Sequence, residues 1–300
     1  MGFDLVKATE DFLCRPSFRG HSDCHLYPSE ASVVVTDKFG DRVVHGGCLR
    51  SGYYRCTGEE AIPFDARSKS IFELGNTVED MLVADWQQMG IFIAHGVRFQ
   101  NLEYNLSGEI DVVLRNPETD QLFGVEIKSF YGYFATTEIF GNKGKAGQAK
   151  MNNLLQTLVY AREFKDSLNH FKLFYEDRGD GSKKSFDVSV VPTELEDTSI
   201  VYRPVVDGKV IAEFTVDDIY ARYALLNKHI LDGVIPDRDF ELRFSNDRIE
   251  RDYQNGKISD SKYNKFKRVS KRDGSVKYVE RDRPGDWNCL YCKYKDLCWK

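Results

Sequence analysis

The sequence predicts an α/β fold, with a mixed central sheet flanked by helices. Apolar residues recur at helical spacing in some segments and alternate with polar residues in others. These segments follow one another as helix, strand, strand, strand, helix, strand, an order that places helices against the faces of a sheet. The chain has 300 residues and 41% of them are hydrophobic. This is enough for one enzyme core with an added lobe.

The first elements follow from apolar spacing and turn residues. Residues 1–30 are polar and are predicted to be irregular. A helix is expected over residues 68–90, and Gly90 would end it. Residues 97–130 are expected to form strands around a turn, because Asn-Pro and acidic residues gather at 115–121. The helix is predicted from large apolar side chains at helical spacing: Ile71, Leu74, Val78, Met81, Leu82 and Trp86.

The remaining elements complete the core and add a second lobe. After the hairpin we expect a helix over 147–164, a strand over 170–178, strands over 185–191, 199–205 and 209–215, and a helix over 216–233. Residues 246–286 are highly charged with little periodicity. The predicted organisation is an N-terminal segment (1–67), a core (68–180), accessory strands and a helix (181–245), and a basic C-terminal segment (246–300).

Charge and hydropathy exclude several classes of protein. The net charge of −5 argues against a uniformly basic nucleic-acid binder, so DNA contacts must come from local basic patches. No run of about 18 apolar residues occurs, which predicts no transmembrane helix and no membrane partner. The N-terminal stretch carries acids and lacks a long apolar run, so no secretory signal is expected. A cytoplasmic protein is the resulting expectation.

The stretch FGVEIKSF, residues 123–130, places an acid and a lysine on one face of a predicted strand. Glu126 and Lys128 point the same way because strand side chains alternate. Two charges on a core face are costly unless they serve chemistry. The hairpin would bring Asp111 beside Glu126, and two converging carboxylates suit Mg²⁺ or Mn²⁺. Lys128 would then hold water or neutralise charge on a phosphate. The alternative is a surface strand with an ordinary Glu–Lys pair.

Two predicted helices carry further polar pairs. In Gly75-x-x-x-Glu79, the glutamate would add a third carboxylate, and the alternative is a solvated side chain. In Gln156-x-x-x-Tyr160, the pair lies on one helix face and would point at a DNA backbone. The alternative is that Tyr160 packs in the core and Gln156 is exposed.

Together these motifs resemble the PD-(D/E)XK nuclease superfamily, and within it the RecB-like exonuclease branch. The motifs are Gly75-x-x-x-Glu79, Gly108-Glu109-Ile110-Asp111, Glu126-Ile127-Lys128 and Gln156-x-x-x-Tyr160, over about a third of the chain. The resemblance implies a restriction-endonuclease-like core in which Glu79, Asp111, Glu126 and the carbonyl of Ile127 bind metal. Lys128 would be the catalytic lysine, and Gln156 and Tyr160 would position substrate. Position 79 is often His in that branch, so Glu79 is a mild departure.

The function that this resemblance implies is a divalent-metal-dependent DNA exonuclease. Its substrate would be single-stranded DNA or DNA ends, in recombination, repair, or CRISPR or phage DNA processing. A helicase or a CRISPR-adaptation protein would be its partner, and a homo-oligomer is compatible with the branch. Two alternatives stay open: a non-catalytic DNA-binding assembly subunit that keeps the fold, and an endonuclease.

Seven cysteines occur, an odd number that argues against a disulfide scaffold in a chain without a secretion signal. Cys289, Cys292 and Cys298 are spaced closely enough to bind one soft metal centre, which needs a fourth ligand from upstream. The resemblance to CRISPR-associated RecB-like exonucleases implies a 4Fe-4S cluster that joins the N- and C-terminal segments. Cys48, in CLRSGYY, is the preferred fourth ligand, with Cys14 as the competitor. Zn²⁺ and unliganded thiols are the alternatives.

The other cysteines and the nearby tryptophans have simpler expected roles. Cys24 and Cys56 are expected to have no metal role. Trp287 and Trp299 are expected to pack around the cysteine cluster.

Three lysines, a basic segment and one histidine each have a simpler interpretation beside a functional one. Lys143, Lys145 and Lys150 do not fit a phosphate-loop motif, so no ATPase is predicted, and they would contact DNA phosphates or lie in a solvated loop. Residues 257–283 hold ten Lys or Arg against four acids, with aromatic residues interleaved. This composition is typical of single-strand binding or of a flexible charged surface. His95 is expected to be structural.

Overall fold

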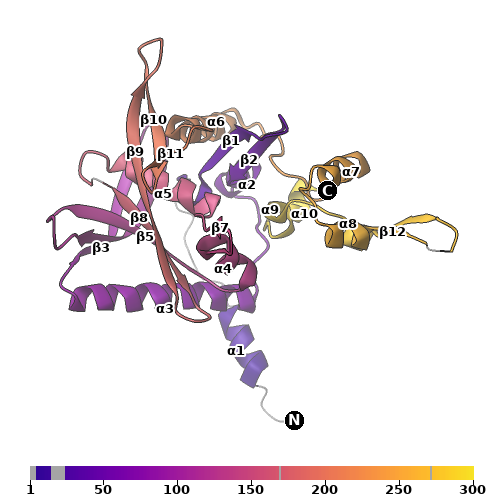
Figure 1. Ribbon diagram of the computed structural model, residues 1–300, viewed down its shortest axis with the longest axis horizontal. Helices are drawn as coiled ribbons and strands as arrows, with labels where there is room; N and C mark the ends of the chain where they lie inside the picture. The colour runs from indigo at the N-terminus through magenta and orange to yellow at the C-terminus, as the bar shows by residue number, and fades with distance from the viewer. Residues whose placement is uncertain (1–4, 15–23, 169, 271) are drawn as a thin grey trace. The chain divides into compact units, whose positions relative to one another are not determined.

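The computed structural model describes residues 5–14, 24–168, 170–270 and 272–300 (Figure 1). The chain forms two compact units. The first runs to Glu59 and continues over Pro63–Pro236, and the second comprises Glu60–Ile62 and Asp237–Lys300.

A seven-stranded mixed sheet forms the centre of the first unit. Its strands, in spatial order, are β11 (Lys209–Val210), β10 (Ile200–Val206), β9 (Lys183–Glu194), β8 (Phe171–Asp177), β5 (Leu122–Phe130), β4 (Leu106–Arg115) and β3 (Phe92–Asn101). β5 and β8 are parallel, and the other neighbouring strands are antiparallel. The α/β class and the mixed central sheet flanked by helices are therefore confirmed.

Two helices position the polar residues of the core motifs. The N-cap residue of α3 (Ala66–Gln88) is Asp65, whose side chain accepts a hydrogen bond of 2.8 Å from the Ser68 N–H. The helix buries Leu82 and Trp86 against sheet residues that include Val125. α5 (Met151–Glu163) packs on the face that carries Gly124 and Glu126. There, the Tyr160 ring of α5 stacks on Phe171, which lies beside Gly124.

Several shorter elements surround this framework in the first unit. They are α1 (Leu5–Leu13), η1 (Pro28–Glu30), β1 (Ser32–Thr36), β2 (Arg42–Gly46), α2 (Leu49–Cys56), α4 (Tyr133–Phe140), β6 (Gly141–Asn142), β7 (Lys145–Ala146) and α6 (Val216–Asp232). α6 packs against α2, β1, β10 and α5. The described residues of this unit hold one disulfide, between Cys24 and Cys56.

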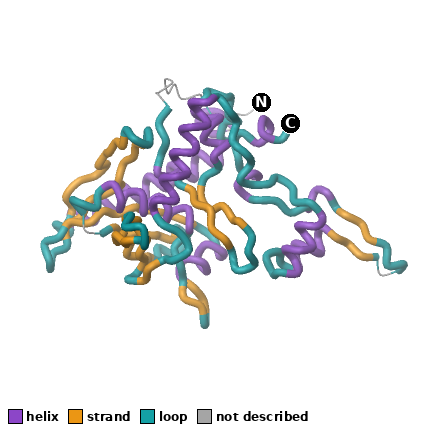
Figure 2. Tube along the Cα trace, turned by 90° about the horizontal axis from the view of Figure 1, so that it is seen from above, coloured by secondary structure: helices purple, strands orange, loops and turns teal. Residues whose placement is uncertain are grey.

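The second unit is built from short helices and a two-stranded ribbon. Its elements are α7 (Asn246–Gln254), α8 (Asp260–Phe266), β12 (Lys267–Val269), β13 (Val276–Tyr278), η2 (Glu280–Asp282), α9 (Trp287–Leu290) and α10 (Lys295–Cys298). Phe244, Ile249, Ile258 and Phe266 form its small buried cluster. Figure 2 shows the ribbon of β12 and β13 extending beyond the end of α8. The basic 257–283 segment is therefore folded in its described parts, although its sequence has little periodicity.

The predicted elements agree with the structure where apolar periodicity is strong. The helices expected over 68–90, 147–164 and 216–233 correspond to α3, α5 and α6. The helix over residues 5–13 was not expected, nor was α4. The strand expected over 209–215 is wrong beyond Val210, because the chain leaves the sheet after β11.

The strands expected as accessory, β9 to β11, extend the same sheet as the core strands. No helix within the described ranges is long and apolar enough to cross a membrane.

Candidate catalytic site

The hairpin of β4 and β5 brings Asp111 to Glu126. A turn with a 2.8 Å hydrogen bond from the Asn116 N–H to the Gln121 carbonyl joins the two strands, which pair Val112 with Val125. Asp111 lies one residue beyond that pair, and its Oδ2 accepts a hydrogen bond of 2.7 Å from the Ile127 N–H. The predicted convergence of these strands is thus present at the level of the backbone.

Glu126 is a completely buried carboxylate, with 0% of its surface exposed. Its Oε1 forms an ion pair with Nζ of Lys128. Among the described residues, neither carboxylate oxygen has a hydrogen bond of good geometry. Burial raises the pKa of Glu126, although the charge of Lys128 acts in the opposite direction. A buried carboxylate in this condition is costly unless another positive charge or a proton compensates it.

Asp111 and Lys128 complete a coupled group of charges around Glu126. Burial, and then the negative charge of Glu126, raise the pKa of Asp111 well above its usual value. Burial alone would lower the pKa of Lys128, but the carboxylates of Glu126 and Asp111 outweigh burial and raise it. Lys128 is therefore a cation at neutral pH, whereas the two acids together tend to retain a proton.

Glu79 reaches the same region from α3. Its Oε1 lies 2.9 Å from Nε2 of His95 on β3. His95 was expected to be structural, and the structure places it against a candidate metal ligand. A histidine that hydrogen-bonds a ligating carboxylate fixes its orientation. The sequence offered no signal for this contact, because the residues are on different elements whose packing cannot be read from spacing.

A cavity of about 530 Å³ unites these residues. Glu79, Asp111, Ile127 and Lys128 line it together with Gln156. They come from α3, β4, β5 and α5, so four sequence-distant segments contribute to one site. Asn152, Asn153 and Arg178 add further polar groups to its wall.

The predicted pair on α5 is divided between the cavity and the core. The side-chain N–H of Gln156 donates a hydrogen bond of 3.1 Å to the Tyr160 hydroxyl. Tyr160 is 3% exposed, and its ring packs against Phe99 and Phe171. Burial raises the pKa of Tyr160, so it is a neutral phenol. Gln156 lines the cavity, and Tyr160 lies behind it as the partner that orients the amide.

The three predicted phosphate-binding lysines do not line the cavity. Lys143 and Lys145 are exposed on the β6–β7 hairpin. Lys150 precedes α5, and its backbone N–H donates a hydrogen bond of 3.1 Å to the Tyr175 hydroxyl. The residues that line the cavity are thus fewer than the residues predicted for the site.

The donor types at the cavity suit a hard divalent cation. Carboxylates and a backbone carbonyl are the ligands that Mg²⁺ and Mn²⁺ prefer. Each acid nevertheless has a protein partner: Glu79 has His95, Asp111 has the Ile127 N–H, and Glu126 has Lys128. In the part of the chain that the structure describes, no group of three or more His, Cys, Asp or Glu is arranged to hold a metal ion. Cation binding would require these partners to shift, and it would compete with protonation of Asp111, whose pKa is raised.

The predicted cluster cysteines lie on both units. Cys48 precedes α2 in the first unit, and Cys289, Cys292 and Cys298 belong to the second. Sγ of Cys292 accepts a hydrogen bond of 3.4 Å from the Tyr294 N–H, a contact typical of ligating thiolates.

The two tryptophans that were expected beside the cluster have different surroundings. Trp287 is 60% exposed, and the Trp299 ring lies 4.2 Å from the guanidinium of Arg238. Cys24 and Cys56, for which no metal role was expected, are bonded to each other.

Comparisons of the chain with protein-family models, with curated proteins and with solved structures found no match. The order of the motifs and the geometry of the cavity are therefore the basis for a functional inference.

Proposed function

We propose that this protein is a divalent-metal-dependent DNA exonuclease with a restriction-endonuclease-like core of the PD-(D/E)XK type. The observation that carries the proposal is the convergence of Asp111, Lys128 and Glu79 on one cavity, beside the buried carboxylate of Glu126. A protein that only binds DNA has no need for a buried acid at this point, because burial of a carboxylate reduces stability. Catalysis at a phosphate would explain why a buried carboxylate is present despite the stability that it costs.

Each residue has a role that its position supports. Glu79, Asp111, Glu126 and the Ile127 carbonyl would hold Mg²⁺ or Mn²⁺, which activates water and neutralises phosphate charge. The Lys128 ammonium would orient the attacking water and stabilise negative charge on the phosphate. The Gln156 amide, oriented by Tyr160, would bind a phosphate oxygen of the substrate.

Single-stranded DNA or DNA ends are the proposed substrate, in recombination, repair, or CRISPR or phage DNA processing. A helicase or CRISPR-adaptation protein is the proposed partner, and a homo-oligomer is compatible with the proposal.

The iron–sulfur cluster is a separate part of the proposal. Cys48, Cys289, Cys292 and Cys298 would supply four thiolates, and Zn²⁺ is the alternative metal. We expect anaerobically purified protein to contain iron and acid-labile sulfide in equal amounts, and Cys292→Ser to lose most of both. If the wild-type protein contains zinc and no sulfide, the four cysteines form a zinc site and not an iron–sulfur cluster.

The nuclease proposal is tested with anaerobically purified protein and end-labelled single- and double-stranded DNA. Reactions contain Mg²⁺, Mn²⁺ or EDTA, and the variants are Lys128→Met and the control Lys172→Met. Lys172 pairs with Asp187, and its side chain is 32% exposed, against 30% for Lys128. We expect metal-dependent shortening of DNA from one end, lost in Lys128→Met and retained in Lys172→Met.

Other outcomes would select the alternatives. DNA binding without cleavage under every metal condition would favour the non-catalytic assembly subunit. Cutting of closed circular DNA at a rate equal to that of linear DNA would favour an endonuclease. Equal cleavage by Lys128→Met and wild type would remove Lys128 from the site.

A further inference from the structure

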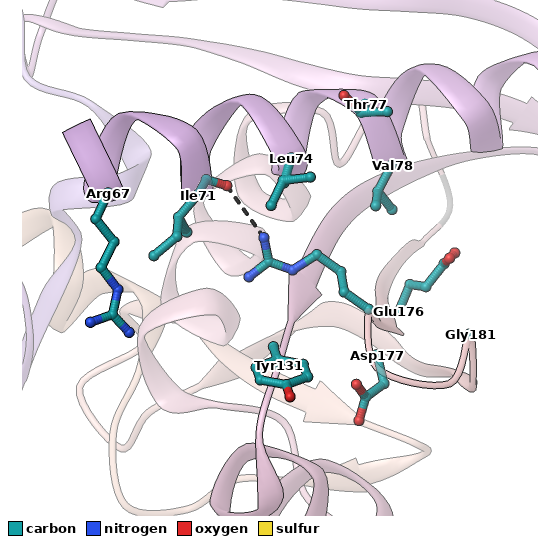
Figure 3. Close-up of a pocket in the computed structure, with 10 residues that line it drawn as sticks. Arg67, Ile71, Leu74, Thr77, Val78, Tyr131, Glu176, Asp177 and Gly181 are labelled. Carbon is teal, nitrogen blue, oxygen red and sulfur yellow. Dashed lines mark hydrogen bonds between the residues drawn. The ribbon is translucent and has the colours of Figure 1, made fainter. Parts of the chain in front are cut away.

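A second cavity adjoins the candidate catalytic cavity and has a volume of about 660 Å³. Arg178 lines both cavities, so they share part of a wall. Figure 3 shows α3 along one side of the second cavity, with Ile71, Leu74 and Val78 directed toward it. Tyr131 lies across from this helix, and Glu176 and Asp177 also line the cavity (Figure 3).

The second cavity lies where two parallel strands end. Phe130, the last residue of β5, is paired with Asp177, the last residue of β8. The Arg178 N–H continues this pairing with a 2.8 Å hydrogen bond to the Phe130 carbonyl. Ligands of α/β proteins characteristically bind beyond the carboxyl ends of adjacent parallel strands. Lys128 is two residues before Phe130, so this strand end leads directly from the catalytic cavity.

Arg178 has donors suited to a phosphate. A guanidinium carries five N–H donors. Its Nη1 donates to the Ile71 carbonyl over 3.4 Å, the interaction marked by a dashed line in Figure 3. Its buried Nε has no hydrogen-bond partner among the described residues. Arg178 lines the cavity, and a planar guanidinium suits an anion that offers two oxygens.

The neighbouring acids do not neutralise this arginine. Asp177 accepts hydrogen bonds from the Thr136 hydroxyl at 2.6 Å and from the Gly179 N–H at 2.8 Å. Glu176 lies 3.2 Å from Nζ of Lys183. Both carboxylates therefore have other partners, and Arg178 is one of two arginines, with Arg67, that line this cavity.

One exposed aromatic ring, that of Tyr131, lines the same cavity as Arg178. Tyr131 is 74% exposed and follows β5, and Tyr133 and Phe134 are 76% and 87% exposed. The hydrogen bond from Thr136 in α4 to Asp177 holds this aromatic segment near the end of β8. Solvent-exposed rings next to an arginine are the combination with which proteins bind single strands, since each unstacked base offers a face. Bases in a duplex are already stacked on one another, so they do not offer such a face.

We propose that the second cavity binds a nucleotide of single-stranded DNA next to the scissile phosphate, with Arg178 on a backbone phosphate and Tyr131 stacked on a base. This inference rests on the proposed nuclease function, which places the scissile phosphate in the first cavity. Ile71 and Leu74 provide the apolar side against which the sugar and base pack. They are 42% and 53% exposed, so the first half of the α3 apolar stripe faces the cavity instead of the core.

The test measures binding and cleavage separately in the full-length protein. Fluorescence anisotropy with a labelled oligothymidylate in EDTA gives Kd without cleavage, and assays with Mn²⁺ give kcat and KM. Arg178→Gln and Tyr131→Ala are each expected to raise Kd and KM roughly tenfold. For Tyr131→Ala, kcat should stay within about twofold of wild type. Tyr131→Phe keeps the ring and should bind normally.

The matched controls are Arg115→Gln and Phe39→Ala. Arg115 is paired with Asp120 on the β4–β5 hairpin, and Phe39 is 41% exposed at the β1–β2 turn. Neither control should change Kd. A duplex of equal length should be affected less by Tyr131→Ala than the single strand, and an equal loss for both would overturn the single-strand assignment.

The outcomes separate this inference from the nuclease proposal. Cleavage by wild type with unchanged Kd and KM in Arg178→Gln and Tyr131→Ala would overturn the inference and leave the nuclease intact. No cleavage by wild type, but weaker binding by both variants, would overturn the nuclease and keep a nucleic-acid site in this cavity. A wild-type protein that neither binds nor cleaves the oligonucleotide would overturn both.

Discussion

At the scale of single residues, the buried charge of Glu126 links the stability of the candidate site to its proposed chemistry. Its carboxylate is fully buried, and Lys128 is its ion-pair partner. Removing one partner of a buried pair leaves a charge without compensation, whereas an exposed pair contributes little to stability. Glu126 and Lys128 are therefore coupled in stability as well as in the proposed chemistry.

Lys128→Met is expected to lower kcat/KM about 100-fold to 1,000-fold, because the phosphate loses a positive charge. The free energy of unfolding should fall by about 2 kcal/mol or more. Lys172→Met removes a lysine of equal exposure whose partner Asp187 is 56% exposed, and should cost less than about 1 kcal/mol. Urea unfolding and a nuclease assay measure both quantities.

A double variant separates the two effects of that substitution. Glu126→Gln combined with Lys128→Met removes both charges, so it should recover most of the lost stability without recovering activity. If the double variant is no more stable than Lys128→Met, the ion pair does not account for the loss.

The raised pKa of Asp111 predicts that the stability of the metal-free protein depends on pH. Burial and the charge of Glu126 raise its pKa well above the usual 3.8, which applies in the unfolded chain. Between those two pKa values the folded protein keeps a proton that the unfolded chain has released. The free energy of unfolding contributed by Asp111 therefore falls as pH rises through this window.

Asp111→Asn removes this titration and keeps an oxygen that accepts the Ile127 N–H. In EDTA near neutral pH we expect the variant to melt a few degrees above wild type, with the difference shrinking as pH falls toward 3.8. Thermal melts at several pH values provide the measurement. Parallel stability profiles for the two proteins would contradict the raised pKa.

At the scale of elements, β5 carries the site because it is held on both sides. It is antiparallel to β4 and parallel to β8. Gly124 permits this packing: a Cβ there would lie 2.1 Å from an atom of the Phe171 ring. The opposite situation occurs at Gly75 in α3, where the nearest atom to a Cβ is the Ser129 hydroxyl oxygen at 3.8 Å.

These two glycines give substitutions with opposite expected signs. Gly124→Ala should lower the free energy of unfolding by roughly 1–3 kcal/mol, because the added carbon overlaps an aromatic ring. Gly75→Ala should raise it by about 0.5–1 kcal/mol, because alanine favours a helix and has room. Chemical unfolding at equal pH compares both with wild type, and a destabilised Gly75→Ala would show that its site is tighter than the structure indicates.

Elements with strong periodicity were predictable, and elements without it were not. α3, α5 and α6 have apolar residues at helical spacing and lie close to their expected ranges. α4 was missed because its sequence, YFATTEIF, is apolar on several sides and buries only Ile139. Within α3, periodicity predicts the helix but does not predict which of its apolar residues are buried. Ile71 and Leu74 follow the same pattern as Leu82 but are exposed, because the structure places a cavity beside them.

At the scale of the whole molecule, the central sheet and the second unit differ in how their backbones are protected. Strands β4, β5 and β8 have hydrogen-bonded neighbours on both sides, whereas β12 and β13 form a two-stranded ribbon. Hydrogen exchange reports the local free energy of opening.

We expect the amides of β5 and β8 to exchange slowest in the molecule, roughly 1,000-fold or more slower than those of β12 and β13. Hydrogen–deuterium exchange with mass spectrometry on the full chain resolves the corresponding peptides. Equal protection of β5 and the ribbon would show that the sheet is not the stable core of the molecule.

The sequence by itself determined the class of the fold, the long helices and the hairpin that places Asp111 near Glu126. These depend on periodicity and on a short hairpin, which are local properties of the chain. Tertiary structure alone decided that β9 to β11 extend the central sheet, that His95 meets Glu79, that Tyr160 lies behind Gln156, and that Arg178 lies between two cavities. Such contacts join residues that are far apart along the chain or on separate elements. Their formation depends on how the helices and strands pack together, and residue spacing alone does not encode that packing.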